Sequence, residues 1–143
     1  MPVQDSAELR RIIQIPNREW TEEQTQDLVL KMTAALKTPG GTQTLRPLQA
    51  LALAEAVRYK GAFVPAPVGA GKTLISLLLP RLFRTVQRPM IVLPAHLIAK
   101  TEAEALGYRK HWVLPPFFKL QSYQALSRVS SSDLLDRVQP DLL

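Results

Sequence analysis

The chain has 143 residues, of which 46% are hydrophobic and 21% are charged, and this balance excludes a disordered or fibrous protein. Cysteine is absent, which excludes disulfides, thiolate metal sites and cysteine nucleophiles. No apolar run of about 20 residues is present and the N-terminus carries no secretory pattern, so we expect no membrane partner. We expect a cytoplasmic protein, of a bacterial or phage-infected cell, with the nucleus as the alternative.

The formal net charge of +6 is distributed unevenly along the chain. Residues 1–45 carry five Lys/Arg and six Asp/Glu, whereas residues 46–143 carry thirteen and six, a balance of +7. A basic segment of this kind favours an anionic partner such as nucleic acid. The basic residues form no block, so a generic solvated surface is an equal alternative.

The first 41 residues predict two helices. Asp5 or Ser6 can cap the first helix, which Pro16 and Asn17 end. Its apolar positions recur at helical spacing and are Leu9, Ile12 and Ile13.

Thr21 and Gln24 predict a capping box for the second helix. Its apolar stripe consists of Leu28, Val29, Met32, Ala35 and Leu36. We expect Trp20 and Met32 to lie in the core rather than to contact a ligand. The Thr-Pro-Gly-Gly stretch at 38–41 then breaks the helical pattern and separates a helical extension, 1–41, from the remainder, 42–143.

Beyond this break, helices alternate with short apolar strands. We expect helices at 47–59, at 73–83 with an interruption at Pro80, at 95–106 and at 132–138. We expect strands at 62–66, 90–94 and 117–123, and Pro-Asp-Leu-Leu at 140–143 is typical of the opening of a fourth strand. This alternation predicts an α/β fold with a parallel sheet flanked by helices and loops at the carboxyl ends of its strands.

The sequence Ala-Pro-Val-Gly-Ala-Gly-Lys-Thr at 66–73 lies between an apolar strand and an apolar helix, where a phosphate-binding loop is expected. Gly69 and Gly71 permit a backbone that points successive N–H groups at a phosphate, and the following helix adds its positive end. Lys72 would reach the β- and γ-phosphates, and Thr73 would bind Mg²⁺. Ala66 departs from the general consensus, which begins with Gly.

Ala in the first place with Gly in the fourth is the pattern of the superfamily 2 helicases and translocases, and the chain resembles this family from about Leu45 onward. The resemblance implies an incomplete RecA-like P-loop NTPase domain at 42–143 that uses ATP and Mg²⁺. Lys72 and Thr73 would be catalytic. The loop residues implied to contact the nucleotide are Pro67, Val68, Gly69, Ala70, Gly71, Lys72, Thr73 and Leu74.

Leu-Arg-Pro-Leu-Gln at 45–49 resembles the R-x-x-Q element that precedes the phosphate loop in these enzymes, and especially the form found in SNF2-like DNA translocases. The resemblance implies that Gln49 hydrogen-bonds the adenine edge, for which an amide is chemically suited, and that Arg46 assists. The alternative is that Gln49 is an exposed helix residue.

Two further segments resemble nucleic-acid motifs of the same family. The strand and helix at 91–105 are similar to motif Ia, which implies contacts from Pro94, Ala95 and Lys100 to the nucleic-acid backbone, DNA rather than RNA. For His96, a surface or capping residue is an equal alternative to a phosphate contact. The segment 119–128 resembles the next motif, in which Ser122 and Tyr123 line the DNA path, although the edge of the core is an equal interpretation of Tyr123.

The remaining candidates are weaker. His111, beside Trp112, has no Cys or His partner, so it is a poor metal ligand. Phe117 and Phe118 could stack on bases, but we expect them in the core.

Phosphoryl transfer also needs acidic residues that hold Mg²⁺ and position water. No apolar strand of this sequence ends in Asp-Glu, and neither Asp133, Asp136 nor Asp141 has that context. We therefore expect the N-terminal part of a longer ATPase, which binds ATP but hydrolyses little of it alone. The alternative is a non-enzymatic module with a P-loop fold that binds nucleic acid or protein; a small kinase would leave the other motifs unexplained.

Overall fold

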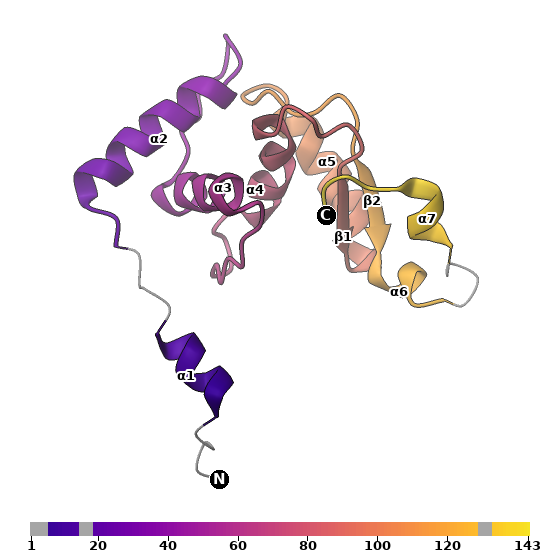
Figure 1. Cartoon of the computed structure of the whole chain (residues 1–143). Coiled ribbons are helices and arrows are strands. Elements are labelled where there is room, and N and C mark those ends of the chain that lie inside the picture. The colour runs from indigo at the N-terminus through magenta and orange to yellow at the C-terminus, as the bar shows by residue number, and fades with distance from the viewer. Residues whose placement is uncertain (1–5, 15–18, 129–132) are drawn as a thin grey trace.

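The computed structural model describes residues 6–14, 19–128 and 133–143. Its elements, with η for 3-10 helices, are α1 (Ala7–Ile13), α2 (Glu22–Leu36), α3 (Pro47–Tyr59), α4 (Lys72–Leu78), η1 (Leu79–Leu82), β1 (Met90–Leu93), η2 (Ala95–Leu97), α5 (Ile98–Tyr108), β2 (Lys119–Ser122), α6 (Tyr123–Leu126) and α7 (Leu134–Val138). Figure 1 shows α3 and α4 between α2 on one side and the two strands on the other. The protein is an α/β structure with a small sheet.

The two strands run parallel, and their register pairs Met90 with Lys119 and Leu93 with Ser122. The C-terminal segment adds a parallel bridge between Leu142 and Pro89. The Met90 N–H donates to the Leu142 carbonyl at 2.8 Å, so the segment expected to open a further strand does begin to pair with β1.

The expected strand at 62–66 is wrong, because residues 61–67 have no regular structure. Among the described residues, no main-chain group hydrogen-bonds to Ala62 or Phe63. The Ala66 N–H donates to the Val64 carbonyl at 2.8 Å, which turns the chain at this point. A strand exists only when a neighbour pairs with it, and none of the described residues pairs with this segment.

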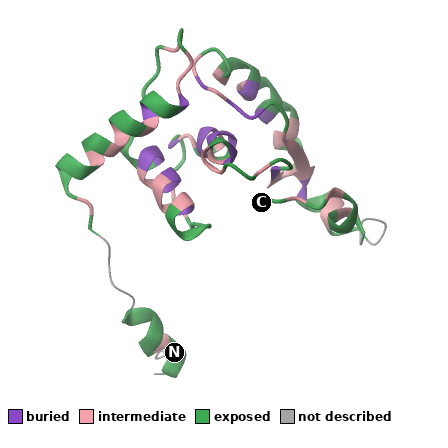
Figure 2. Cartoon of the chain, turned by 45° about the horizontal axis from the view of Figure 1, so that its top comes forward, coloured by how far each residue is buried: buried purple, intermediate pink, exposed green. Residues whose placement is uncertain are grey.

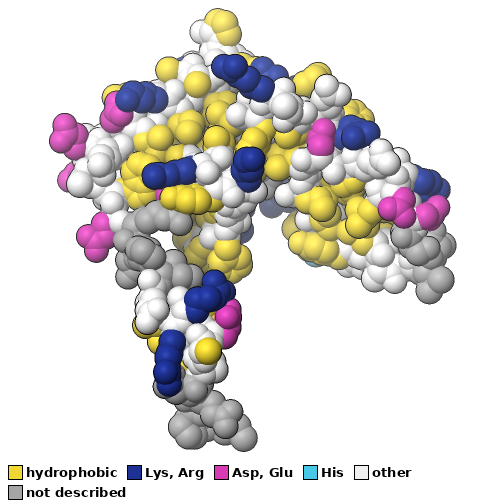
Figure 3. Space-filling view, in the orientation of Figure 1, with side chains coloured by type: hydrophobic (Ala, Val, Ile, Leu, Met, Phe, Trp, Pro, Cys, Tyr) yellow, Lys and Arg dark blue, Asp and Glu magenta, His cyan; other side chains and the backbone are white. Residues whose placement is uncertain are grey.

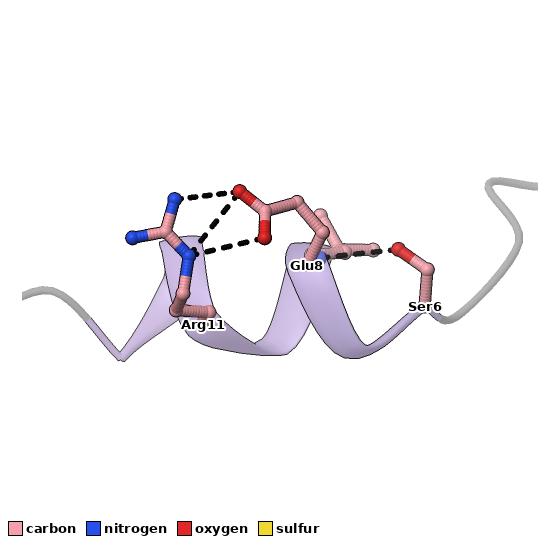
Figure 4. A network of polar contacts seen from close by, with 4 residues as sticks. Ser6, Glu8 and Arg11 are labelled. Carbon is pink, nitrogen blue, oxygen red and sulfur yellow. Dashed lines mark hydrogen bonds and ion pairs between the residues drawn. The ribbon is translucent and has the colours of Figure 1, made fainter.

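The first helix, α1, is capped by Ser6, whose Oγ accepts a hydrogen bond from the Leu9 N–H at 3.1 Å. Figure 4 shows this cap beside the ion pair of Glu8 and Arg11. The Arg11 hydrogen bonds lower the pKa of Glu8 below its ordinary value. None of the α1 residues is buried. The other expected cap, Asp5, and the expected helix end at 16–17 lie outside the described residues.

The second helix, α2, begins with the predicted capping box: the Gln24 N–H donates to Thr21 Oγ1 (3.2 Å) and the Thr21 N–H donates to Gln24 Oε1 (3.0 Å). The stripe residues that pack on the core are Leu28, Val29, Met32 and Leu36. The expected burial of Ala35 is wrong, because this residue is exposed. The buried face of α2 includes Thr33 instead, and the Thr33 hydroxyl oxygen accepts a hydrogen bond from the Leu45 N–H at 3.1 Å.

Proline shapes the next two helices as predicted. Pro47 is the first residue of α3, where its missing N–H costs nothing. Pro80 lies in η1, so the predicted helix at 73–83 is divided into a regular α4 and a 3-10 continuation.

The core lies mainly on α3 and α4, and Figure 2 shows the buried residues gathered there while α1 is exposed. The largest fully buried side chains are Trp112, Leu53, Leu77 and Leu78. Trp20 is half-buried. Phe118 packs against the core as expected, but Phe117 is 61% exposed, because neighbours in an extended segment face opposite sides. No helix among the described residues has the length and apolar character that crossing a bilayer requires.

Candidate functional site

The loop Ala66–Thr73 joins the irregular segment 61–67 to α4. Gly69 and Gly71 have φ of +81° and +80°, a left-handed backbone that favours glycine. Gly71 is also the N-cap of α4. A Cβ atom at Gly71 would lie 2.3 Å from Gln49 Nε2, whereas one at Gly69 would meet nothing within 4 Å.

The first turn of α3 holds this loop through two side chains. Arg46 Nη1 donates to the Gly69 carbonyl at 2.8 Å, and Gln49 Nε2 donates to the Ala70 carbonyl at 3.1 Å. Gln49 Oε1 accepts the Arg46 N–H at 2.9 Å, so both ends of the amide are bonded. Gln49 is 5% exposed, and the alternative of an exposed helix residue is therefore wrong.

Lys72 bends back over the loop. Its Nζ donates to the carbonyls of Ala66 and Pro67, both at 3.0 Å. The other predicted loop residues divide into an exposed group, Pro67, Val68 and Gly69, a half-buried group, Gly71 and Thr73, and a buried group, Ala70 and Leu74. Of the exposed group, Pro67 supplies one of the two carbonyls that hold the Lys72 ammonium group, while the buried residues anchor the loop to the core.

A cavity of about 360 Å³ lies beside this loop. Its lining residues are Gln43, Thr44, Arg46, Gln49, Gly69, Gly71, Leu74, Tyr108 and Trp112. Trp112 Nε1 donates to Gln43 Oε1 at 2.9 Å. Burial is the main cause that raises the pKa of Tyr108 above its ordinary value, and the charge of Glu104 adds to this effect. The charge of the nearby Arg46 acts in the opposite direction.

Sequence reasoning missed the aromatic wall of this cavity, Tyr108 and Trp112. Tyr108 is the last residue of α5 and Trp112 lies beyond the helix, and nothing in the local sequence marks either as a neighbour of the loop. They reach it through the packing of α5 against α4. A tertiary contact of this kind leaves no local signal.

The predicted nucleic-acid residues meet at the carboxyl edge of the sheet. The register of Leu93 with Ser122 brings η2 beside α6, and the Ala95 N–H donates to Gln124 Oε1 at 3.2 Å. Pro94 is half-buried, and the exposed residues at this edge are Ala95, His96, Lys100 and Tyr123.

Two of these side chains are already engaged. Ser122 is buried, and its Oγ accepts the Ala125 N–H at 3.1 Å, so this hydroxyl caps α6. Lys100 lies 3.8 Å from Glu104 in an exposed ion pair. Tyr123 is 56% exposed, which makes the core-edge interpretation of it wrong.

Charged and metal-binding groups are dispersed. Figure 3 shows single Lys and Arg side chains scattered over the visible face rather than a block. In the part of the chain that the structure describes, no three His, Asp or Glu residues gather in a group that could hold a metal ion. The His111 Nδ1 lies 3.2 Å from the Thr42 N–H and accepts its hydrogen bond, so this histidine has a structural role.

Comparison of the chain with protein-family models, with curated proteins and with solved structures found no match.

Proposed function

We propose that this chain binds ATP through the loop Ala66–Thr73 and forms the ATP-binding part of a superfamily 2 helicase or translocase with a RecA-like P-loop fold. One observation carries the proposal. Two motifs identified separately in the sequence are in contact, because Arg46 and Gln49 hydrogen-bond loop carbonyls that lie 23 and 21 residues away. A shared nucleotide site would require this contact, which supports the proposal.

The Lys72 ammonium group is the centre of the proposed phosphate site. Its two hydrogen bonds go to carbonyl oxygens of the loop, and the phosphate oxygens of a nucleotide take their place. The left-handed backbone at Gly69 and Gly71 then lets loop N–H groups turn toward the same phosphates.

The Thr73 hydroxyl fits the role of a Mg²⁺ ligand. Mg²⁺ in nucleotide sites keeps several waters and needs only one or two protein ligands besides the phosphates, so the lack of a carboxylate cluster among the described residues is compatible with it. When bound, the ion neutralises phosphate charge. Thr73 would hold it and Lys72 would complete the charge balance.

The cavity beside the loop is the proposed base site. The Gln49 amide donates to the Ala70 carbonyl and accepts the Arg46 N–H in the structure. An amide has a second N–H and a second oxygen lone pair, so Gln49 would contact an adenine edge while it still holds the loop. Tyr108 offers an aromatic surface at the same cavity.

The exposed residues at the carboxyl edge of the sheet are the proposed nucleic-acid contacts. Ala95 and His96 open η2, Lys100 supplies a positive charge, and Tyr123 is free to stack on a base. The resemblance to SNF2-like translocases favours DNA over RNA.

Measurement of ATP turnover with and without DNA tests this proposal. We expect ATP and DNA to bind and turnover to remain close to background, because no apolar strand of the sequence ends in the required acids. Strong DNA-stimulated turnover that is lost in Lys72→Ala would contradict the expected lack of hydrolysis. DNA binding without ATP binding would replace the proposal with a non-enzymatic binding module.

A further inference from the structure

A further cavity, of about 530 Å³, lies at the amino end of the two strands. It is lined by Pro89, which directly precedes β1, and by Phe117, which lies shortly before β2. The proposed nucleic-acid contacts lie at the opposite, carboxyl edge of the same sheet, and none of them lines this cavity. It also shares no lining residue with the cavity beside the phosphate loop, so it belongs to neither site.

This cavity carries positive charge and no negative charge. Arg81 and Arg84 line it, both are exposed, and none of its lining residues is acidic. Neither guanidinium group forms an ion pair or a hydrogen bond with another described residue. Because a guanidinium group matches the geometry of a phosphate or a carboxylate, the pair favours an anionic ligand.

Phenyl rings form another part of the wall. Phe83 is half-buried, whereas Phe117 is 61% exposed and lies in a segment without regular structure. Single-stranded nucleic acids are bound by this combination, in which cations hold the phosphates and exposed rings stack on the bases.

A peptide would find few main-chain partners here. Four lining residues have no N–H to donate, namely Pro80, Pro89, Pro115 and Pro116. Three of their carbonyls already accept hydrogen bonds, from the Phe83 N–H, the Lys119 N–H and the Arg109 guanidinium group. The Gln87 N–H is bonded to Asp141. Charge and ring faces remain, and these suit a nucleic acid better than an acidic peptide.

We propose that this cavity binds single-stranded nucleic acid, with Arg81 and Arg84 on its phosphates and a base stacked on Phe117. This contact is separate from the one proposed at the carboxyl edge, and it does not require ATP to be bound.

Fluorescence anisotropy of a labelled oligo(dT) of about eight nucleotides tests the arginines. Arg81→Gln with Arg84→Gln should weaken binding by roughly tenfold or more. The slope of log affinity against log salt should fall by about 1.4, because each phosphate contact to a single strand contributes about 0.7. The control, Arg58→Gln with Lys110→Gln, removes the same charge from exposed residues outside the cavity and should keep the parent slope.

The same assay with Phe117→Leu tests stacking, since leucine is apolar but has no ring. We expect affinity to fall by at least about fivefold. The control, Phe63→Leu, removes a phenyl ring that is 93% exposed and outside the cavity, and should bind as the parent does. All the substituted side chains are exposed, so each variant should melt as the parent does.

Unchanged affinity and salt slope in the double arginine variant would overturn the proposal, and so would equal effects of the two phenylalanine substitutions. Binding of dTMP as tight as that of the oligonucleotide would assign the cavity to a free nucleotide. Tighter binding of a Glu/Phe peptide that depends on the same arginines would assign it to a protein. Either result would overturn the assignment to a strand.

A further pair of substitutions separates this inference from the proposed function. Loss of oligonucleotide binding in Lys100→Gln with Tyr123→Leu, but not in the cavity variants, would overturn the inference and leave the contacts at the carboxyl edge standing. ATP binding is measured separately, so failure at this cavity is distinct from failure of the proposed nucleotide site.

Discussion

Gly69 and Gly71 share a left-handed backbone, yet only Gly71 faces another side chain. Replacement of Gly69 by Ala should destabilise the protein by about 1–2 kcal/mol, the cost of a Cβ in this backbone region. Replacement of Gly71 by Ala should cost roughly 1–3 kcal/mol more, because the Cβ displaces the Gln49 amide from the Ala70 carbonyl. Urea unfolding of both variants measures the difference.

A double variant separates backbone strain from the Gln49 contact. In a Gln49→Ala background, the cost of Gly71→Ala should fall to that of Gly69→Ala, because the side chain that the Cβ meets has been removed. Equal costs for the two glycine variants in the parent chain would contradict the contact between the loop and α3.

At the scale of single residues, the sequence predicted which residues form the candidate site but few of their hydrogen-bond partners. The glycines, Lys72 and Thr73 follow from the motif and its place before an apolar helix. The engagement of Gln49 with the loop depends on which groups folding brings together. Hydrogen-bond partners distant in sequence leave no periodic signal.

Among the elements, the C-terminal segment is attached by a carboxylate to the residues that precede β1. Asp141 accepts hydrogen bonds from the main-chain N–H groups of Gln87 and Arg88, both at 2.8 Å. The hydrogen bond from Gln87 is the main cause that lowers the pKa of Asp141 below its ordinary value of 3.8, and the Arg88 N–H and charge act in the same direction. A depressed pKa means that the folded state favours the ionised form.

This attachment predicts a pH-dependent stability. The contribution of Asp141 should be fully present above a pH of 3.8, its ordinary pKa, and should be lost as the pH falls through the lower pKa of the folded state. The parent chain should therefore melt at a higher temperature than Asp141→Asn near neutral pH, and the gap should narrow under more acidic conditions. Thermal melts of both proteins across this pH range measure the difference in melting temperature. A difference that stays constant in acid would argue against the attachment through Asp141.

The hydrogen bond between Thr33 of α2 and Leu45 predicts a second effect on the free energy of unfolding. Thr33 is buried and accepts the Leu45 N–H, so Thr33→Val keeps the shape but leaves that N–H without a partner. We expect destabilisation by about 1–3 kcal/mol in denaturant unfolding. Thr44→Val is the matched control, since Thr44 is exposed and its hydroxyl has no hydrogen bond among the described residues. Equal effects of the two substitutions would indicate that α2 is not held by this bond.

Helices were predicted better than strands, for a physical reason. The capping box of α2, Pro47 and Pro80 act within one or two turns, so their effects can be read locally. The apolar run at 62–66 has the composition of a strand, but pairing depends on a neighbour that the local sequence does not specify. The burial of Thr33 in place of Ala35 likewise follows from the position of α3.

For the whole molecule, the charge balance alone identified no site. On the face shown in Figure 3 the Lys and Arg side chains are scattered, whereas Lys72 is held within a loop that also contains two left-handed glycines. The net positive charge of residues 46–143 would act on a defined ligand at the proposed phosphate site, between Lys72 and the loop N–H groups.

The most direct test is a calorimetric titration of the chain with ATP and Mg²⁺. We predict one binding site that is weakened at least about tenfold in Lys72→Ala, because a charge-assisted hydrogen bond to phosphate contributes about 1.5–3 kcal/mol. The control, Lys110→Ala, removes an exposed lysine outside the loop and should bind as the parent does. Absence of ATP binding by the parent chain, or equal affinity of the parent and Lys72→Ala, would contradict the proposed nucleotide site.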